Sequence, residues 1–164
     1  MLATLNDVDC EDIGRLGGLT ALDLCACPRI SDAGLKQIGL LAGRQAKALA
    51  QWEALPDAFR AATPPPPALT HLDLGGLSRV SDAALSKLLA RTPQLTSLDL
   101  RGCSRLSADG LAGCLAGCTS AGVQTTPSLP VPRLALLVLS CVEAATDGVV
   151  EKILVARPAL KLTR

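Results

Sequence analysis

A histidine, a serine and three aspartates occur at matching places in a recurring Leu-x-Leu pattern and could be drawn as a catalytic triad. His71, the only histidine, lies two residues before Asp73, and Ser97 lies two residues before Asp99. Such a group needs a positioned nucleophile to do covalent chemistry. Any repeat protein with a polar face allows a similar triad to be drawn, and no substrate suggests itself. We therefore expect no enzymatic activity and interpret His71 as a surface residue.

The aspartates suggest a binding surface instead. They occupy one outward position of the pattern, as in Leu22-Asp23-Leu24, and parallel strands lie about 4.8 Å apart. Paired in register, their carboxylates would form a stripe for basic side chains of a partner, weakened by Arg101. The alternative is a solvated face without a specific role, since exposed charges contribute little. The predicted column consists of Asn6, Asp23, Asp73, Asp99 and Val138.

The seven cysteines raise the question of a metal site. Cys25 and Cys27 form one close pair, and Cys114 and Cys118 form another, whereas zinc requires four converging ligands. The position of Cys27 holds Leu77 in another repeat, so a small hydrophobic residue suffices there. We expect no metal ion and no cofactor. The odd number of thiols and the lack of a secretory signal favour an intracellular, reducing compartment, most simply the cytoplasm.

Composition narrows the classes of partner. The chain has 164 residues, 16 basic and 15 acidic side chains, and two aromatic residues. The near-zero net charge argues against nucleic acid as a partner, and no apolar run is long enough to span a membrane. The segment Leu74-Gly75-Gly76-Leu77 predicts a strand-exit turn rather than a phosphate-binding loop. We therefore expect protein partners and no small-molecule substrate.

The elements that position these residues come from a repeat. The segment 95–107 follows the frame L-x-x-L-x-L-x-x-C-x-x-L-S, and Leu69 and Leu95 begin frames 26 residues apart. This period lies within the leucine-rich-repeat range of about 20–29 residues. The six frames begin at Leu2, Leu19, Leu69, Leu95, Leu134 and Leu160.

Each frame predicts a strand followed by a helix. The Leu-x-Leu part has the period of a strand, and a Ser or Thr before the next apolar run is a good N-cap. Stacked units then bury their apolar sides together. The first frame has no room for a helix, and the last stops in a strand, so we expect both ends to be covered in a larger assembly. The predicted N-caps are Ser31, Ser81, Ser107 and Thr146.

The pattern L-x-x-L-D-L-x-x-C-x-x-[IV]-[ST]-D-x-[AG]-L, kept best at residues 19–35, resembles the cysteine-containing class of leucine-rich repeats. This class occurs in F-box/leucine-rich-repeat ubiquitin-ligase receptors. The resemblance covers residues 1–42, 69–116 and 134–162, and no stretch looks like an F-box. It implies an α/β fold: a short right-handed solenoid of four to five repeats, with parallel strands on the concave side and helices on the convex side.

Two inserts interrupt the repeats, at about 43–67 and 117–133. The first contains both aromatics, Trp52 and Phe59, and predicts a helix running on to Pro56, a short second helix, and a polyproline stretch at 64–67. Its aromatics suggest either a partner-binding flap or a helix laid over the convex side of the solenoid. The second insert predicts an irregular loop, with a contact arm as the alternative.

Taken together, the sequence predicts one leucine-rich-repeat domain over residues 1–164 that acts as a non-catalytic interaction module. We expect a scaffold-like structural subunit of a larger protein complex. The alternative is a free-standing substrate-recognition adaptor, similar to ubiquitin-ligase receptors, that binds a protein on its concave face. The candidate partner-binding residues are Trp52, Phe59, Asp23, Asp73, Asp99, His71 and Arg101.

Overall fold

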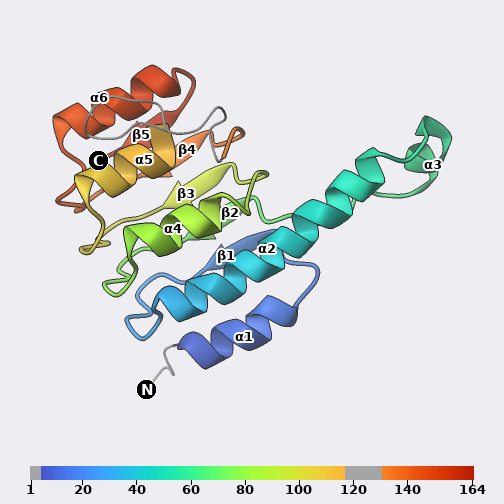
Figure 1. Ribbon diagram of the computed structural model, residues 1–164, viewed down its shortest axis with the longest axis horizontal. Helices are drawn as coiled ribbons and strands as arrows, with labels where there is room; N and C mark the ends of the chain where they lie inside the picture. The colour runs from blue at the N-terminus through green and yellow to red at the C-terminus, as the bar shows by residue number, and fades with distance from the viewer. Residues whose placement is uncertain (1–4, 117–130) are drawn as a thin grey trace.

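The chain folds into a one-layer parallel sheet covered by a row of helices, as the computed structural model shows for residues 5–116 and 131–164 (Figure 1). Helices and strands alternate along most of the chain. The helices are α1 (Asp7–Arg15), α2 (Asp32–Glu53), α3 (Asp57–Ala62), α4 (Asp82–Leu89), α5 (Ala108–Ala116) and α6 (Asp147–Ala156). The strands are β1 (Ala21–Asp23), β2 (His71–Asp73), β3 (Ser97–Asp99), β4 (Leu136–Val138) and β5 (Lys161–Thr163).

The five strands pair in chain order, β1-β2-β3-β4-β5, and every pair is parallel. Equivalent residues of successive repeats are partners, so that Leu22, Leu72 and Leu98 stand in one row. Each strand reaches the next through a helix on the same side of the sheet, and the result is a short right-handed solenoid. The predicted α/β architecture is confirmed.

The core lies between the sheet and the helices and is aliphatic. The second leucine of each Leu-x-Leu pattern is fully buried, as Leu24, Leu74 and Leu100 show. Inward residues of the helices, such as Leu35 and Leu85, close the core from the other side. A helix and a strand that each bury one side only are stable because neighbouring repeats complete the same core.

The prediction for the first frame is wrong. Residues 7–15 form helix α1, and Asn6 is its N-cap, with its side chain accepting a hydrogen bond from the N–H of Val8 and Asp9 completing a capping box. Asn6 therefore does not stand in the strand column before Asp23. Cys10 and Ile13 take the inward helix positions of a repeat rather than those of a strand exit. Leu2 lies outside the described residues.

A second, smaller difference concerns α6. Val150 stands in the frame position of Leu35 and Leu85, but the structure leaves it half-buried and buries Val149 and Ile153 instead. Thr146 is the N-cap of α6 as predicted, but its side chain makes no cap hydrogen bond. No helix among the described residues is long and apolar enough to cross a membrane.

Neighbouring helices are joined by hydrogen bonds at their N-termini. The first residue of one helix is an aspartate, and its carboxylate accepts bonds from the N–H and the hydroxyl of the serine that caps the next helix. Asp32 accepts from Ser81 at 2.8 Å from the backbone nitrogen and 2.7 Å from Oγ. Asp7 with Ser31 and Asp82 with Ser107 repeat this geometry. The Ser-Asp pairs therefore cap helices and also fasten the repeats together.

Candidate interaction surfaces

The concave column of aspartates is in register, as expected. Asp23, Asp73 and Asp99 are direct partners across β1, β2 and β3, and the column continues to Val138 in β4. This face forms a shallow depression of about 360 Å³ that also includes His71 and Ser97. The leucine columns on either side of each aspartate fix this orientation, because successive strand residues alternate between faces.

One oxygen of each of these carboxylates accepts a backbone hydrogen bond in the turn that follows its own strand. Oδ1 of Asp23 accepts the N–H of Cys25 at 2.8 Å, and Oδ1 of Asp73 accepts the N–H of Gly75 at 2.7 Å. Asp99 does the same with the N–H of Arg101. An aspartate that bonds the backbone two residues on stabilises a turn. The column therefore has a structural role that the sequence analysis missed.

Arg101 neutralises much of the column. Its Nε lies 2.8 Å from Asp99 Oδ2, and its Nη2 lies 3.4 Å from Asp73 Oδ2. The hydrogen bond to Asp99, followed by the charge of the same group, raises the pKa of Arg101. Asp23 forms no ion pair among the described residues. The stripe thus offers one largely free carboxylate rather than a continuous acidic surface.

The donor atoms of Asp23, Cys25 and Asp73 lie within 4.8 Å of one another, which makes them the group to test for a cation. They fit one poorly. The guanidinium of Arg101 adjoins Asp73, and both aspartates already bind backbone N–H groups. Burial of part of the thiol, followed by the charge of Asp73, raises the pKa of Cys25, so a thiolate ligand is disfavoured.

His71 does not form the geometry of a triad. It is exposed, and its Nδ1 lies 2.9 Å from the hydroxyl of Thr70, the preceding residue. Ser97 is its partner across the strands, but the hydrogen bond of the ring is with Thr70 and not with Ser97. Thr70 and Thr96 also donate their hydroxyls to the backbone of the preceding repeat, at Thr20 and Thr70. The polar groups here support strand pairing.

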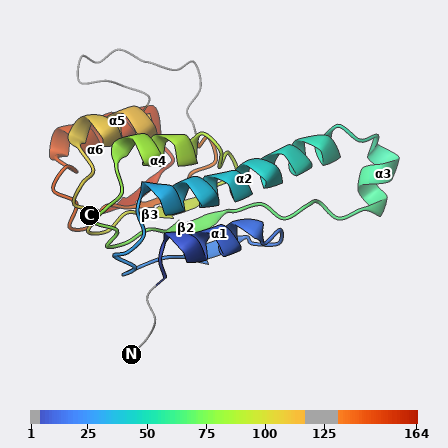
Figure 2. The ribbon, with the colours of Figure 1, turned by 60° about the horizontal axis from the view of Figure 1, so that its bottom comes forward.

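The first insert forms an arm that leaves the solenoid. Helix α2 continues to Glu53 and α3 follows Pro56, so both predicted helices are confirmed. All buried residues of α2 lie between Gly34 and Gln45. Beyond Gln45 the helix extends away from the sheet, with α3 at its far end (Figure 2). The alternative of a helix laid over the convex side is therefore wrong. We use "arm" for residues 46–67.

The two aromatics of the arm have different surroundings. The indole Nε1 of Trp52 donates to Thr63, at 3.1 Å to its carbonyl oxygen and 3.2 Å to Oγ1. The guanidinium of Arg60 lies 6.0 Å from the centre of the Trp52 ring, within cation–π distance. Phe59 has no such role and is 64% exposed, and Leu55 nearby is 41% exposed. Trp52 thus closes the arm, while Phe59 is presented at its tip.

Gln45 anchors the arm at its base. This buried side chain donates to the carbonyl oxygens of Gly17 and Leu19 and accepts the N–H of Leu69 at 3.0 Å. It therefore binds the entries of both β1 and β2. The second insert lies mostly outside the described residues, since only 131–133 of it are described, and its contact-arm alternative stays a prediction.

The cysteines behave mainly as small hydrophobic residues. Cys10, Cys103 and Cys114 are buried, and burial raises the pKa of each thiol to about 11. Cys25 and Cys141 are exposed. All six cysteines within the described residues are free thiols. Cys118 lies outside the described residues.

Comparison with known proteins supports the fold. No family model matches the sequence, and no curated protein matches it. A solved structure does: the chain is similar to one chain in the crystal structure of the Rad7 and Elc1 complex in yeast, with a TM-score of 0.56 and 15% sequence identity. The similarity covers 96% of this chain but only 39% of the other. The fold is that of a short leucine-rich-repeat solenoid. At this identity the likeness shows the fold alone.

Proposed function

We propose that this chain is a non-catalytic protein–protein interaction module and serves as a structural subunit of a larger complex, which it joins through its arm. The observation that carries this proposal is the exposed tip. Phe59 and Leu55 are large apolar side chains held away from the core that could bury them. An exposed aromatic residue is a typical anchor of a protein interface.

The arm suits this role because it is held at both ends. Gln45 fixes its base to two strand entries, and Trp52 joins the end of α2 to Thr63. An anchor on a preorganised segment loses little conformational freedom on binding, so more of the contact energy appears as affinity. The prolines at 64–67 add stiffness to the returning chain.

We further propose that residues 1–164 form one domain of the cysteine-containing class of repeats. Support comes from Cys103, a buried residue in the cysteine position of its frame, whose Sγ lies 3.2 Å from the carbonyl oxygen of Leu74 in the preceding repeat. The thiol therefore bridges two repeats where a leucine could only pack. The free thiols of the described residues are consistent with a protein of a reducing compartment, and we propose the cytoplasm.

An adaptor that binds a protein on the concave face is the second candidate. It is supported by the depression across the aspartate column, where Asp23 is exposed and His71 lies nearby. It ranks below the arm because Arg101 already pairs with two of the three carboxylates. The chain also spans well under half of the Rad7–Elc1 chain that it resembles, so that complex does not fix the role of this one.

The test replaces both tip residues, Leu55→Ser and Phe59→Ser, in the full chain expressed in its native cells. We expect the wild-type protein to elute in a large complex on gel filtration of a native extract, and the variant to elute as a free chain. The matched control is Leu154→Ser with Val155→Ser, which removes two exposed apolar side chains of α6 instead.

Elution of the tip variant with the complex would contradict the proposal. Replacement of Asp23 and Arg101 by alanine then tests the concave face in the same experiment. Loss of the complex in that variant alone would favour the adaptor.

A further inference from the structure

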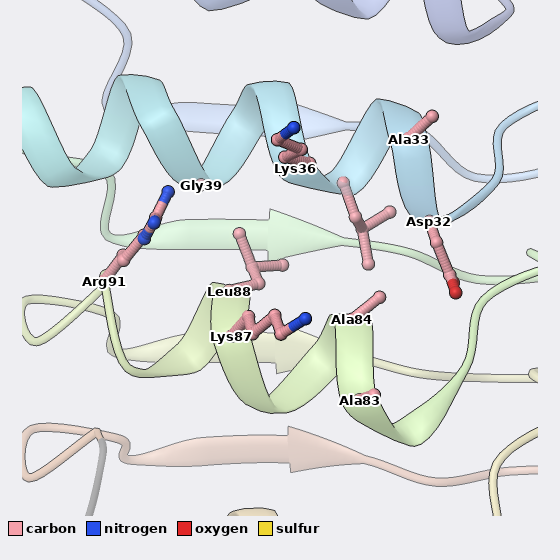
Figure 3. A pocket seen from close by; sticks show the side chains of 10 residues that line it. Asp32, Ala33, Lys36, Gly39, Ala83, Ala84, Lys87, Leu88 and Arg91 are labelled. Carbon is pink, nitrogen blue, oxygen red and sulfur yellow. The ribbon is translucent and has the colours of Figure 1, made fainter.

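A groove runs along the convex side between α2 and α4. It consists of two adjoining hollows of about 540 and 460 Å³, and Gly39 and Arg91 belong to both. Figure 3 shows the first hollow, with Lys36 on α2 and Lys87 on α4 on opposite sides and Arg91 extending from the end of α4 toward Gly39. We call it the α2–α4 groove.

Basic side chains line both sides of this groove. Lys36 and Lys47 lie on one face of α2, eleven residues or about 16 Å apart along the helix. Lys87 on α4 and Arg91, two residues beyond the end of that helix, lie on the facing side. All four are exposed. Two rows of positive charge thus face each other in a chain whose net charge is only +1.

Within the described residues, none of the four basic side chains forms an ion pair. Asp32 is the only acid lining the groove, and both of its oxygens accept bonds from Ser81. The residues outside the described part contain no Asp or Glu.

The acids of the neighbouring helix α1 are also engaged. Asp7 accepts hydrogen bonds from Ser31, and Asp9 accepts the N–H of Asn6. The remaining two, Glu11 and Asp12, pair with Arg15. Asp82 at the start of α4 is held by Ser107. These carboxylates keep their negative charge, but none of them forms an ion pair with a basic side chain of the groove, so these basic groups can pair with an external anion.

The floor between the two rows is apolar. Ala84 and Leu88 line it from α4, and Leu40, 38% exposed, lines it from α2. The aliphatic part of Arg91 lies beside Gly39 and Gly43, with its Cδ at ordinary contact distances of 3.6 and 3.8 Å from where a Cβ at these positions would stand. A floor of this kind accepts side chains of a partner, whereas a phosphate group alone would not use it.

We propose that the α2–α4 groove binds an acidic amphipathic helix of a partner protein. An apolar stripe of that helix packs on the floor, and carboxylates on both sides of the stripe meet the lysines and Arg91. The pattern is helix-in-groove recognition, with the charge rows setting orientation and partner choice. This inference rests on the proposed role as an interaction module, but it uses a surface separate from the arm.

The test measures binding of a fluorescent peptide of about twelve residues, or three helical turns, with a leucine stripe flanked by glutamates. Two probes accompany it: a peptide of the same composition with the stripe scrambled, and a single-stranded oligothymidine. The full chain is compared with Lys36→Glu plus Lys87→Glu. The control, Arg105→Glu plus Lys161→Glu, makes the same change in net charge at exposed sites elsewhere.

We expect the amphipathic peptide to bind the wild-type chain and the control alike, and the groove variant to bind about tenfold more weakly. The groove variant should melt at the same temperature as the wild type or higher, since it removes like-charge repulsion in the free chain. A merely structural role for the lysines would lower that temperature.

Three results would overturn the inference: no saturable binding of the amphipathic peptide, equal losses in both double variants, or binding of oligothymidine in its place. None of them touches the proposed function, because the tip variant Leu55→Ser with Phe59→Ser keeps the groove intact. Conversely, if the wild-type chain binds the peptide but the tip variant still elutes in the complex, the inference about the groove is supported and the proposed role of the arm is contradicted.

Discussion

We call the hydrogen bonds that link one helix to the next a joint. The joints are of two kinds, and the first three along the chain differ from the fourth. The first three, from α1 through α5, each carry an aspartate that accepts two bonds from the next capping serine. The fourth, between α5 and α6, has Ala108 in place of the aspartate and Thr146 in place of the serine, and Thr146 makes no side-chain cap bond. The device at the helix starts is therefore interrupted at one place.

The fourth joint is held at the opposite end of its helices. Arg157, the C-cap of α6, is buried and donates Nε to the carbonyl oxygen of Leu115 and Nη1 to that of Val131, both at 2.6 Å. Burial lowers the pKa of Arg157, which is the unfavourable part of this arrangement. The first three joints are thus fastened by cap bonds at the helix starts, and among the described residues the fourth is fastened by the hydrogen bonds of Arg157 at the helix ends.

The largest effect should come from Arg157→Met, which keeps much of the apolar volume and removes both donors. Buried acceptors that lose their partners cost about 1–3 kcal/mol each. With the gain from no longer burying a charge, we expect the free energy of unfolding in urea to fall by about 3 kcal/mol. A loss smaller than that of the aspartate variant below would show that Arg157 does not hold the fourth joint.

The next effect should come from Asp82→Ala, which leaves the N–H and hydroxyl of Ser107 without their acceptor. We expect a loss of about 2 kcal/mol, measured in the same urea titration. Asp147→Ala is the matched control, because Asp147 also begins a helix, but among the described residues its exposed carboxylate pairs with Arg164 and not with a capping serine. That control should lose under about 0.5 kcal/mol. Equal losses would mean that helix capping, not the joint, carries the effect.

The sequence predicts the columns of the sheet because Leu-x-Leu spacing permits only one face for the core. A one-residue slip would expose Leu24 and its equivalents. The length of α2 was also predictable, since good helix formers run from Arg44 to Leu55 and Pro56 follows, so the helix that begins after Ser31 can continue. Both rest on local spacing, which one sequence contains in full.

The first frame misled because two patterns overlap there. Leu5 and Cys10 fit the strand frame, while Asn6-Asp7 is also a cap followed by an acid, the same order as Ser31-Asp32. The spacing of 17 residues between Leu2 and Leu19 was the signal that the strand interpretation was out of register. The joints and the groove were not predictable, because they depend on how far apart neighbouring helices lie.

A smaller effect should appear as a pH dependence at the first joint. Burial alone would raise the pKa of Asp7, but bonds from the hydroxyl and N–H of Ser31 and from the N–H of Gly34 outweigh it, and the pKa is lowered. A carboxylate with a lowered pKa stabilises the folded state above its unfolded pKa of about 3.9, and this contribution is lost as pH falls through the folded value.

Asp7→Asn removes this titration while keeping the size of the side chain. We expect the wild type to be the more stable at pH 7 and the difference between the two melting temperatures to shrink below about pH 4. A difference that stays constant from neutral pH to pH 3 would show that the charge of Asp7 does not contribute to the joint.

The smallest expected effect is a gain, from Ala108→Asp, which restores the missing aspartate at the start of α5. Two contributions must be separated. An acid in the first turn of a helix gains about 0.3–1 kcal/mol from the helix dipole alone. Ala83→Asp in α4 supplies that contribution at an exposed site that already has its joint through Asp82.

If the interruption at the fourth joint is only a missing acceptor, Ala108→Asp should raise the free energy of unfolding by about 0.5–1 kcal/mol more than Ala83→Asp does. This excess should shrink when Thr146 is also replaced by alanine, because the hydroxyl donor of the new joint is lost while the backbone N–H of residue 146 remains. An excess that does not change without the Thr146 hydroxyl, or no excess at all, would mean that α5 and α6 are too far apart for the cap bonds, and that Arg157 replaces a joint which this part of the solenoid cannot form.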